Sequence, residues 1–135
     1  MNKYYLSLGS NLGNRAQYLE QARTALRQLG NMTRASAVIE TKPFGAADQL
    51  FLNQLIVLQT ELPPAELLDC LKTIEQRLGR QHRQHWDNRE IDLDIVLWSG
   101  GKLDTMTPHG YTLTLPHPGF TDRPFLQDLY ESITG

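Results

Sequence analysis

The sequence has one cysteine, Cys70, so it can form neither an intrachain disulfide nor a cysteine-rich metal site. It has no apolar run approaching about 18 residues, and its first residues lack the apolar core of a signal peptide. Basic residues are not in excess either, because the net charge is −2. A general affinity for nucleic acid or anionic membranes would need such an excess. We therefore expect a cytoplasmic protein that binds neither.

Three common catalytic or nucleotide-binding patterns are also missing. The sequence contains no Gly-x-x-x-x-Gly-Lys-Ser/Thr loop, no Gly-x-Gly-x-x-Gly fingerprint and no serine in a nucleophile-elbow pattern. What is present is ordinary for a globular protein: 40% hydrophobic and 21% charged residues in a chain of 135. This length and composition predict one domain spanning residues 1–135.

Hydrophobic periodicity predicts the order strand, helix, strand, strand, helix, strand. We expect the strands near residues 4–9, 33–41, 55–58 and 91–98. One helix is expected between Asn14 and Gly30 and the other between Pro63 and Gly79. This order is typical of an α+β, ferredoxin-like βαββαβ fold, an antiparallel sheet with helices on one face. A C-terminal extension should hold a short strand near 113–115 and one short helix.

The last strand of this pattern carries a pair of acids. Apolar residues occupy every second position: Ile91, Leu93, Ile95 and Leu97. Asp92 and Asp94 should therefore emerge together on the opposite face, with Cα atoms about 6.5–7 Å apart. Such carboxylates repel each other, and Mg²⁺ removes that repulsion because it takes one or two carboxylates together with substrate phosphates. The alternative is a solvated sheet face that carries two acids.

A basic segment precedes the acidic pair. It contains Arg77, Arg80, Arg83 and Arg89. Arginine forks match phosphate oxygens, so this segment could close over a bound triphosphate and exclude water. Alternatively, its arginines pair with surface acids. A zinc site formed by His82, His85 and the two aspartates is a weaker alternative, since His-x-x-His is not a specific pattern.

Six motifs together resemble the 6-hydroxymethyl-7,8-dihydropterin pyrophosphokinase family. They are LGSNLG at 8–13, TKPFG at 41–45, FLN at 51–53, IEQRLGR at 74–80, WDNREIDLDI at 86–95 and LPHP at 115–118. The resemblance implies transfer of diphosphate from ATP to the hydroxymethyl group of a reduced pterin, with release of AMP, in folate biosynthesis. It also implies a monomer whose partners are these two small molecules.

The resemblance assigns roles to individual residues. Asp92 and Asp94 would hold two Mg²⁺ ions, and they would act in catalysis together with Arg80 and Arg89. The ATP-binding residues would be Glu75, Arg80, Arg89, Ile95, His117 and Arg123. The pterin-binding residues would be Thr41, Pro43, Phe44, Phe51, Asn53, Trp86 and Phe125.

The chain also departs from the family. Thr112 stands where many members have an arginine, and the tail after Phe125 is short. These departures leave open a paralogue of weak or no activity that binds a pterin or nucleotide, or that acts on another heterocycle. A ferredoxin-like RNA-binding module is a third alternative, but the acidic pair would repel RNA phosphates unless metal intervened.

Overall fold

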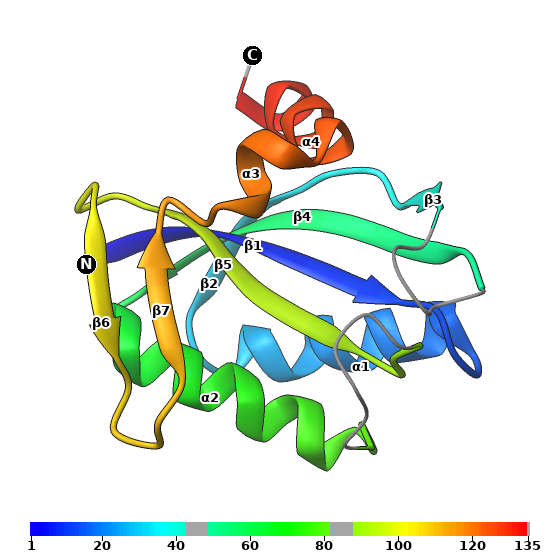
Figure 1. Cartoon of the computed structure of the whole chain (residues 1–135), viewed down its shortest axis with the longest axis horizontal. Coiled ribbons are helices and arrows are strands. Elements are labelled where there is room, and N and C mark those ends of the chain that lie inside the picture. Colours follow the sequence, from blue (N-terminus) through cyan, green and yellow to red (C-terminus); the bar gives the residue numbers. More distant parts are fainter. Residues whose placement is uncertain (43–48, 82–87, 135) are drawn as a thin grey trace.

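The computed structural model describes residues 1–42, 49–81 and 88–134 (Figure 1). Within them the elements follow in this order: β1 (Asn2–Ser10), α1 (Arg15–Arg27), β2 (Asn31–Ala35), β3 (Ile39–Thr41), β4 (Phe51–Thr60), α2 (Pro64–Arg77), β5 (Asp92–Trp98), β6 (Leu103–Met106), β7 (Thr112–Leu115), α3 (Gly119–Asp122) and α4 (Pro124–Thr134).

The main sheet is antiparallel and has the order β2-β4-β1-β5, with β3 also paired to β4. With α1 after β1 and α2 after β4, this arrangement confirms the predicted ferredoxin-like fold. The strand expected at 33–41 is instead two strands, β2 and β3. The pairing changes at Ser36, whose hydroxyl accepts a hydrogen bond from the Leu55 N–H at 2.9 Å in place of a backbone carbonyl.

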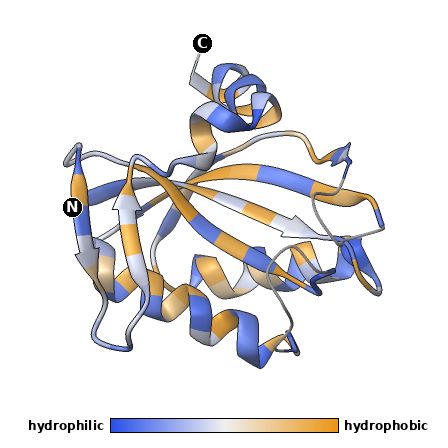
Figure 2. Cartoon of the chain, viewed as in Figure 1, coloured by the Kyte–Doolittle hydropathy of each residue, from blue (hydrophilic) through white to orange (hydrophobic). Residues whose placement is uncertain are grey.

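The first face of the sheet is covered by α1 and α2, as predicted (Figure 1). Asn14 caps α1, because its Oδ1 accepts a hydrogen bond from the Gln17 N–H at 3.1 Å. Both helices turn apolar stripes toward the strands, and the core contains Leu19, Leu26, Leu67 and Leu71. Hydrophobic and hydrophilic residues are interspersed along the strands (Figure 2). This is expected because successive side chains of a strand point to opposite faces of the sheet.

The C-terminal extension differs from the prediction in two ways. It forms a hairpin, β6–β7, that is separate from the main sheet, and it forms two helices, α3 and α4, where we expected one. These helices lie over the second face of the sheet (Figure 1). They cover only part of it, through a small core made of Leu55, Val57, Val96, Leu129 and Ile133.

A bulge in β5 contradicts the predicted burial of Leu97 beside Ile95. Tyr5 pairs with Leu97 and Leu6 pairs with Ile95, so Val96 is an extra residue in the ladder. An extra residue reverses the facing of those that follow, and Leu97 therefore packs on the second face with Val96. Asp92 and Asp94 precede the bulge and keep their expected facing. Among the helices of the described ranges, none has the length and apolar character needed to cross a membrane.

Candidate active site

The two acids lie on the second face of the sheet, beyond the part that α3 and α4 cover. In the register of the sheet, Asp92 is opposite Gly9 and Asp94 is opposite Ser7, so both carboxylates leave the same face of β5. Leu93 between them points into the core beneath α1 and α2. The pair is partly exposed, with 17% of the Asp92 side chain and 27% of the Asp94 side chain accessible. The prediction that they share one face is confirmed.

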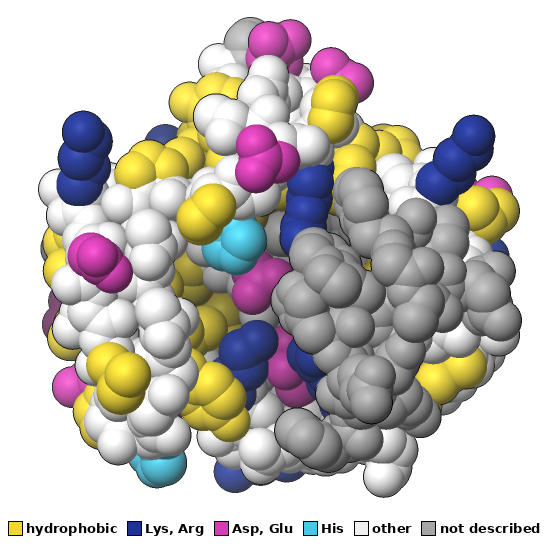
Figure 3. All heavy atoms as spheres, viewed as in Figure 1, with side chains coloured by type: hydrophobic (Ala, Val, Ile, Leu, Met, Phe, Trp, Pro, Cys, Tyr) yellow, Lys and Arg dark blue, Asp and Glu magenta, His cyan; other side chains and the backbone are white. Residues whose placement is uncertain are grey.

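Two pockets lined by described residues meet at this pair, and Figure 3 shows a hollow in which acidic, basic and histidine side chains gather. The first pocket is lined by, among others, Thr41, Phe51, Asn53, Arg89, Asp92 and Phe125. The second is lined by, among others, Lys72, Asp94, Ile95, Thr112 and His117. Since one acid belongs to each pocket, β5 is the boundary at which molecules bound in both would come together.

The first pocket combines aromatic rings with polar groups. Phe51 and Phe125 contribute rings, and the Asn53 amide nitrogen donates a hydrogen bond to the Thr41 hydroxyl. Gly9 also lines this pocket. A side chain at this position would crowd Asn53, because an added Cβ would lie 3.1 Å from Asn53 Oδ1. A flat, polar-edged heterocycle suits such a lining. The other predicted pterin contacts, Pro43, Phe44 and Trp86, lie outside the described residues, as do His82 and His85 of the zinc alternative.

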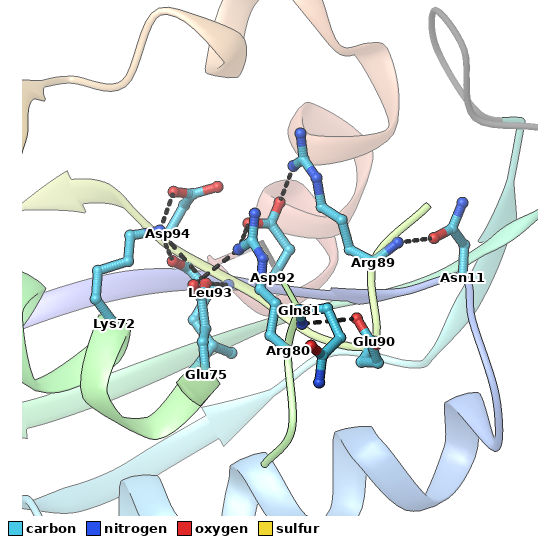
Figure 4. Close-up of polar contacts among 10 residues, drawn as sticks. All are labelled: Asn11, Lys72, Glu75, Arg80, Gln81, Arg89, Glu90, Asp92, Leu93 and Asp94. Carbon is cyan, nitrogen blue, oxygen red and sulfur yellow. Dashed lines mark hydrogen bonds and ion pairs between the residues drawn. The ribbon is translucent and has the colours of Figure 1, made fainter. Parts of the chain in front are cut away.

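Two arginines hold Asp92 at the edge of the first pocket (Figure 4). Arg80 Nη1 lies 3.1 Å from Asp92 Oδ1, and Arg89 Nη1 lies 2.9 Å from Asp92 Oδ2. Burial acts to raise the pKa of Asp92, but the charges of Arg89, Lys72 and Arg80 outweigh it and lower that pKa. Asp92 is therefore an anion at neutral pH, and the two guanidinium groups are fixed beside it.

The buried carboxylate of Glu75 on α2 belongs to the same network. It accepts hydrogen bonds from the Leu93 N–H at 2.7 Å, from Arg80 at 2.7 Å and from Lys72 at 3.3 Å. Burial raises the pKa of Glu75 to about 7, although the charges of Lys72 and Arg80 oppose the shift. Its side chain is only 4% exposed, and it is not among the lining residues of either pocket. Here Glu75 positions two cations; the predicted contact with ATP stays a prediction.

Asp94 is less well compensated than Asp92. Lys72 Nζ lies 3.9 Å from Asp94 Oδ1, which is a long distance for an ion pair. Burial and the neighbouring charge of Asp92 raise the pKa of Asp94, against the opposing charges of Lys72 and His117. An acid in this situation gains from an added cation.

The pair fits a hard divalent cation such as Mg²⁺. Both residues offer carboxylate oxygens, which are the preferred ligands, and both open toward a pocket. No group of three or more His, Cys, Asp or Glu side chains with metal-binding geometry occurs in the described ranges. The remaining ligands would therefore come from water and from the oxygens of a phosphate-bearing substrate, the usual arrangement for Mg²⁺.

Asn11, which the sequence did not single out, ties the basic segment to β1. Its side chain is fully buried. Its Nδ2 donates to the Gln49 carbonyl at 3.0 Å and to Asn88 Oδ1 at 2.8 Å, and its Oδ1 accepts from the Arg89 N–H at 2.6 Å. These partners are far away in the sequence, so no local pattern could reveal them. Asn11 thus fixes the backbone from which Arg89 reaches Asp92.

The structure places the remaining predicted residues on both sides of β5. Ile95 and His117 line the second pocket, and Arg123 lines the first. The Nδ1 of His117 accepts a hydrogen bond from the Gly119 N–H at 2.9 Å, which fixes the ring orientation. Sequence reasoning missed Lys72 in the second pocket. Its spacing of three from Glu75 on a helix was the available signal, because such residues lie on one side of a helix.

The chain is similar to known proteins over nearly its whole length. The model of the family described as 7,8-dihydro-6-hydroxymethylpterin-pyrophosphokinase (HPPK) matches residues 5–134. The 2-amino-4-hydroxy-6-hydroxymethyldihydropteridine pyrophosphokinase of Bacillus subtilis (strain 168) is 39% identical over 128 residues, which cover 93% of this chain and 74% of that protein. The protein of the same name from Aquifex aeolicus (strain VF5) is 37% identical over 126 residues, covering 93% and 76%.

Solved structures agree on the fold. A crystal structure of Plasmodium falciparum HPPK-DHPS with SDX-DHP matches with a TM-score of 0.77 at 15% identity. The match covers 98% of this chain but 40% of that chain, and at this identity it supports the fold alone. The family match and the two bacterial relatives decide the family. This chain belongs to the 7,8-dihydro-6-hydroxymethylpterin-pyrophosphokinase family.

Proposed function

We propose that the protein transfers a diphosphate group from ATP to the hydroxymethyl group of 6-hydroxymethyl-7,8-dihydropterin, releasing AMP, in folate biosynthesis. The observation that carries this proposal is the meeting of two unlike pockets at one pair of acids. The first pocket, with Phe51, Asn53 and Phe125, would take the pterin. The second, with Lys72 and His117, would take the nucleotide. The names of the two bacterial relatives, both pyrophosphokinases, support the same reaction.

The proposed reaction is a substitution at the β-phosphorus of ATP. The pterin hydroxyl oxygen forms a bond to that phosphorus and gives up its proton to solvent, the bond from the phosphorus to the oxygen bridging to the α-phosphate breaks, and AMP leaves with the electron pair. Such transfers rely on positioning and on stabilisation of charge, so the protein needs no covalent nucleophile. Arg80 and Arg89 stand beside Asp92, at the boundary where the β-phosphate would lie. Their fixed charges would stabilise the negative charge on the transferring group.

We further propose that the reaction depends on Mg²⁺, with two ions held by Asp92 and Asp94. When bound, the ions would offset the negative charge of the phosphate groups. The protein's own part is to hold both carboxylates on the same face of β5, which follows from the pairing of β5 with β1. The contacts proposed for ATP are Glu75, Arg80, Arg89, Ile95, His117 and Arg123.

Both pockets are formed by one chain, which supports a monomer as the working unit. We propose that this monomer acts in the cytoplasm, in keeping with ATP as its co-substrate. The inactive-paralogue alternative rests on Thr112 and the short tail. Thr112 lies in the second pocket, but Lys72 and His117 line that pocket too, so it keeps cationic and hydrogen-bonding groups for phosphate.

The test is product identification. The protein is incubated with ATP, Mg²⁺ and 6-hydroxymethyl-7,8-dihydropterin, and nucleotides are separated by chromatography. We expect AMP to form together with a pterin diphosphate, and to form only when the pterin is present. Formation of ADP, or no turnover at any magnesium concentration, would reject the proposal. Tight pterin binding in calorimetry without AMP would favour the inactive paralogue.

A further inference from the structure

Lys72 forms an ion pair with Asp94. It projects from α2, and its Nζ lies 3.3 Å from Glu75 Oε2 and 3.9 Å from Asp94 Oδ1 (Figure 4). The same Nζ lies 3.4 Å from the Leu93 carbonyl. Its side chain is 19% exposed and lines the second pocket. Lys72 therefore stands where a cation bound to Asp94 would come close to it.

In the network around Lys72 each carboxylate already has a cationic partner without any metal. Ion pairs connect three carboxylates, Glu75, Asp92 and Asp94, with three cations, Lys72, Arg80 and Arg89. A divalent ion that arrives at Asp94 without its own anion adds two positive charges beside these cations. The ammonium of Lys72 would be the first group to repel it, since it already lies next to the same carboxylate.

The contacts of Lys72 are the weakest in the network. The arginine contacts span 2.7 to 3.1 Å, whereas those of Lys72 span 3.3 to 3.9 Å. Charge-assisted hydrogen bonds of full strength are shorter, at about 2.7–2.9 Å. An ammonium on a flexible stem at these longer distances also moves more easily than the Arg80 guanidinium, whose Nη1 lies 2.7 Å from Glu75 and 3.1 Å from Asp92. Lys72 is thus the cation that can leave at the least cost.

We propose that Lys72 is a removable counter-ion that keeps free divalent cations off Asp94. It neutralises this carboxylate in the metal-free protein, and it turns toward the phosphates in the second pocket when a metal arrives together with a nucleotide. Lys72 is a positioning residue in this role, not a catalytic one. The inference rests on the proposed function only for the identity of the incoming anion.

The experiment measures Mn²⁺ binding to the full chain without nucleotide, by the loss of the free Mn²⁺ signal in electron paramagnetic resonance. We compare the wild type with Lys72→Gln and Lys72→Met, which lack the charge, and with Lys72→Arg, which keeps it. Lys102→Gln is the matched control, because Lys102 is exposed in the turn before β6. Circular dichroism confirms that each variant is folded.

Removal of the charge should tighten Mn²⁺ binding about tenfold, the size expected when one nearby positive charge is lost from a partly exposed site. The arginine variant and the Lys102 control should bind as the wild type does. With the non-transferable analogue α,β-methylene-ATP present, the two uncharged variants should bind the metal–nucleotide complex more weakly than the wild type. A purely structural role of Lys72 predicts weaker Mn²⁺ binding in the variants, not tighter binding.

Unchanged or weakened Mn²⁺ affinity in both uncharged variants overturns the inference. Its failure can be separated from failure of the proposed function. Wild-type protein that forms AMP, with no tightening in the variants, would reject the role of Lys72 alone. Tightening in the variants, with no AMP from the wild type, would reject the pyrophosphokinase activity and leave the counter-ion in place.

Discussion

Replacement of Asn11 by alanine tests whether the loop after β1 positions Arg89, the arginine that we propose acts in catalysis. The change removes three side-chain hydrogen bonds, to Gln49, Asn88 and Arg89. A typical buried hydrogen bond contributes about 1 kcal/mol net, so the free energy of unfolding should fall by about 2–4 kcal/mol. Asn11 is fully buried, so water cannot easily replace the lost partners.

The same change should slow the reaction. The Arg89 N–H loses its acceptor on Asn11, and the segment that carries the guanidinium is then free to shift relative to Asp92. Misplacement of a positioned group by about 1 Å can cost about a hundredfold in rate. We therefore expect kcat for AMP formation to fall by about that factor, measured at saturating ATP and pterin.

Asn14→Ala is the matched control, because it makes the same chemical change in the same loop. Asn14 caps α1 through a single hydrogen bond to the Gln17 N–H, so its loss should cost about 1 kcal/mol and leave kcat unchanged. Urea unfolding gives the stabilities, and an AMP-release assay gives the rates. If Asn11→Ala lost no more stability than Asn14→Ala, or kept the wild-type kcat, the positioning role would be refuted.

Three further predictions concern the site itself. Asp94→Asn should lower the rate of AMP formation by at least about a thousandfold through loss of a metal ligand, with little change in thermal unfolding; Asp92→Asn should lose activity similarly, and near-normal rates in both would contradict the metal assignment. Phe125→Ala should raise the KM for the pterin about tenfold and leave that for ATP within about twofold; steady-state kinetics would contradict the pocket assignment if only the KM for ATP rose. Burial raises the pKa of Glu75 from 4.5 to about 7. Between pH 4.5 and pH 7 the folded protein therefore keeps a proton on Glu75 that the unfolded chain has lost. This difference lowers the free energy of unfolding as the pH rises. In Glu75→Gln the decline from pH 5 to pH 8 should be smaller by on the order of 1–3 kcal/mol in urea unfolding, and an equal decline in both proteins would show that Glu75 is not shifted.

The order of elements was predictable because each depends on a local period. Alternation along β5 and the helical spacing of Leu67 and Leu71 in α2 are properties of neighbouring residues. The bulge at Val96 was not predictable, since it depends on how β5 pairs with β1 and not on its own sequence. The break between β2 and β3 likewise depends on Ser36 meeting Leu55 across the sheet.

The candidate site was likewise predictable only in part. The shared face of Asp92 and Asp94 follows from strand geometry, and the structure confirms it. The grouping of these acids with Arg80 and Glu75 depends on α2 packing against β5, which no short pattern encodes. The role of Asn11 also could not be predicted, because its hydrogen-bond partner Arg89 lies 78 residues away in the sequence. The roles assigned to the individual site residues stay predictions, and Pro43, Phe44 and Trp86 also lie outside the described residues.

We propose that Asp92 and Asp94 together hold the metal where the two pockets meet. The most direct test is a crystal structure with Mn²⁺, α,β-methylene-ATP and the pterin, using anomalous scattering to locate the metal. We predict manganese peaks within about 2.0–2.3 Å of carboxylate oxygens of both aspartates, with the pterin hydroxyl facing the β-phosphorus. Manganese bound away from either aspartate, or a nucleotide whose phosphates point away from β5, would contradict the account.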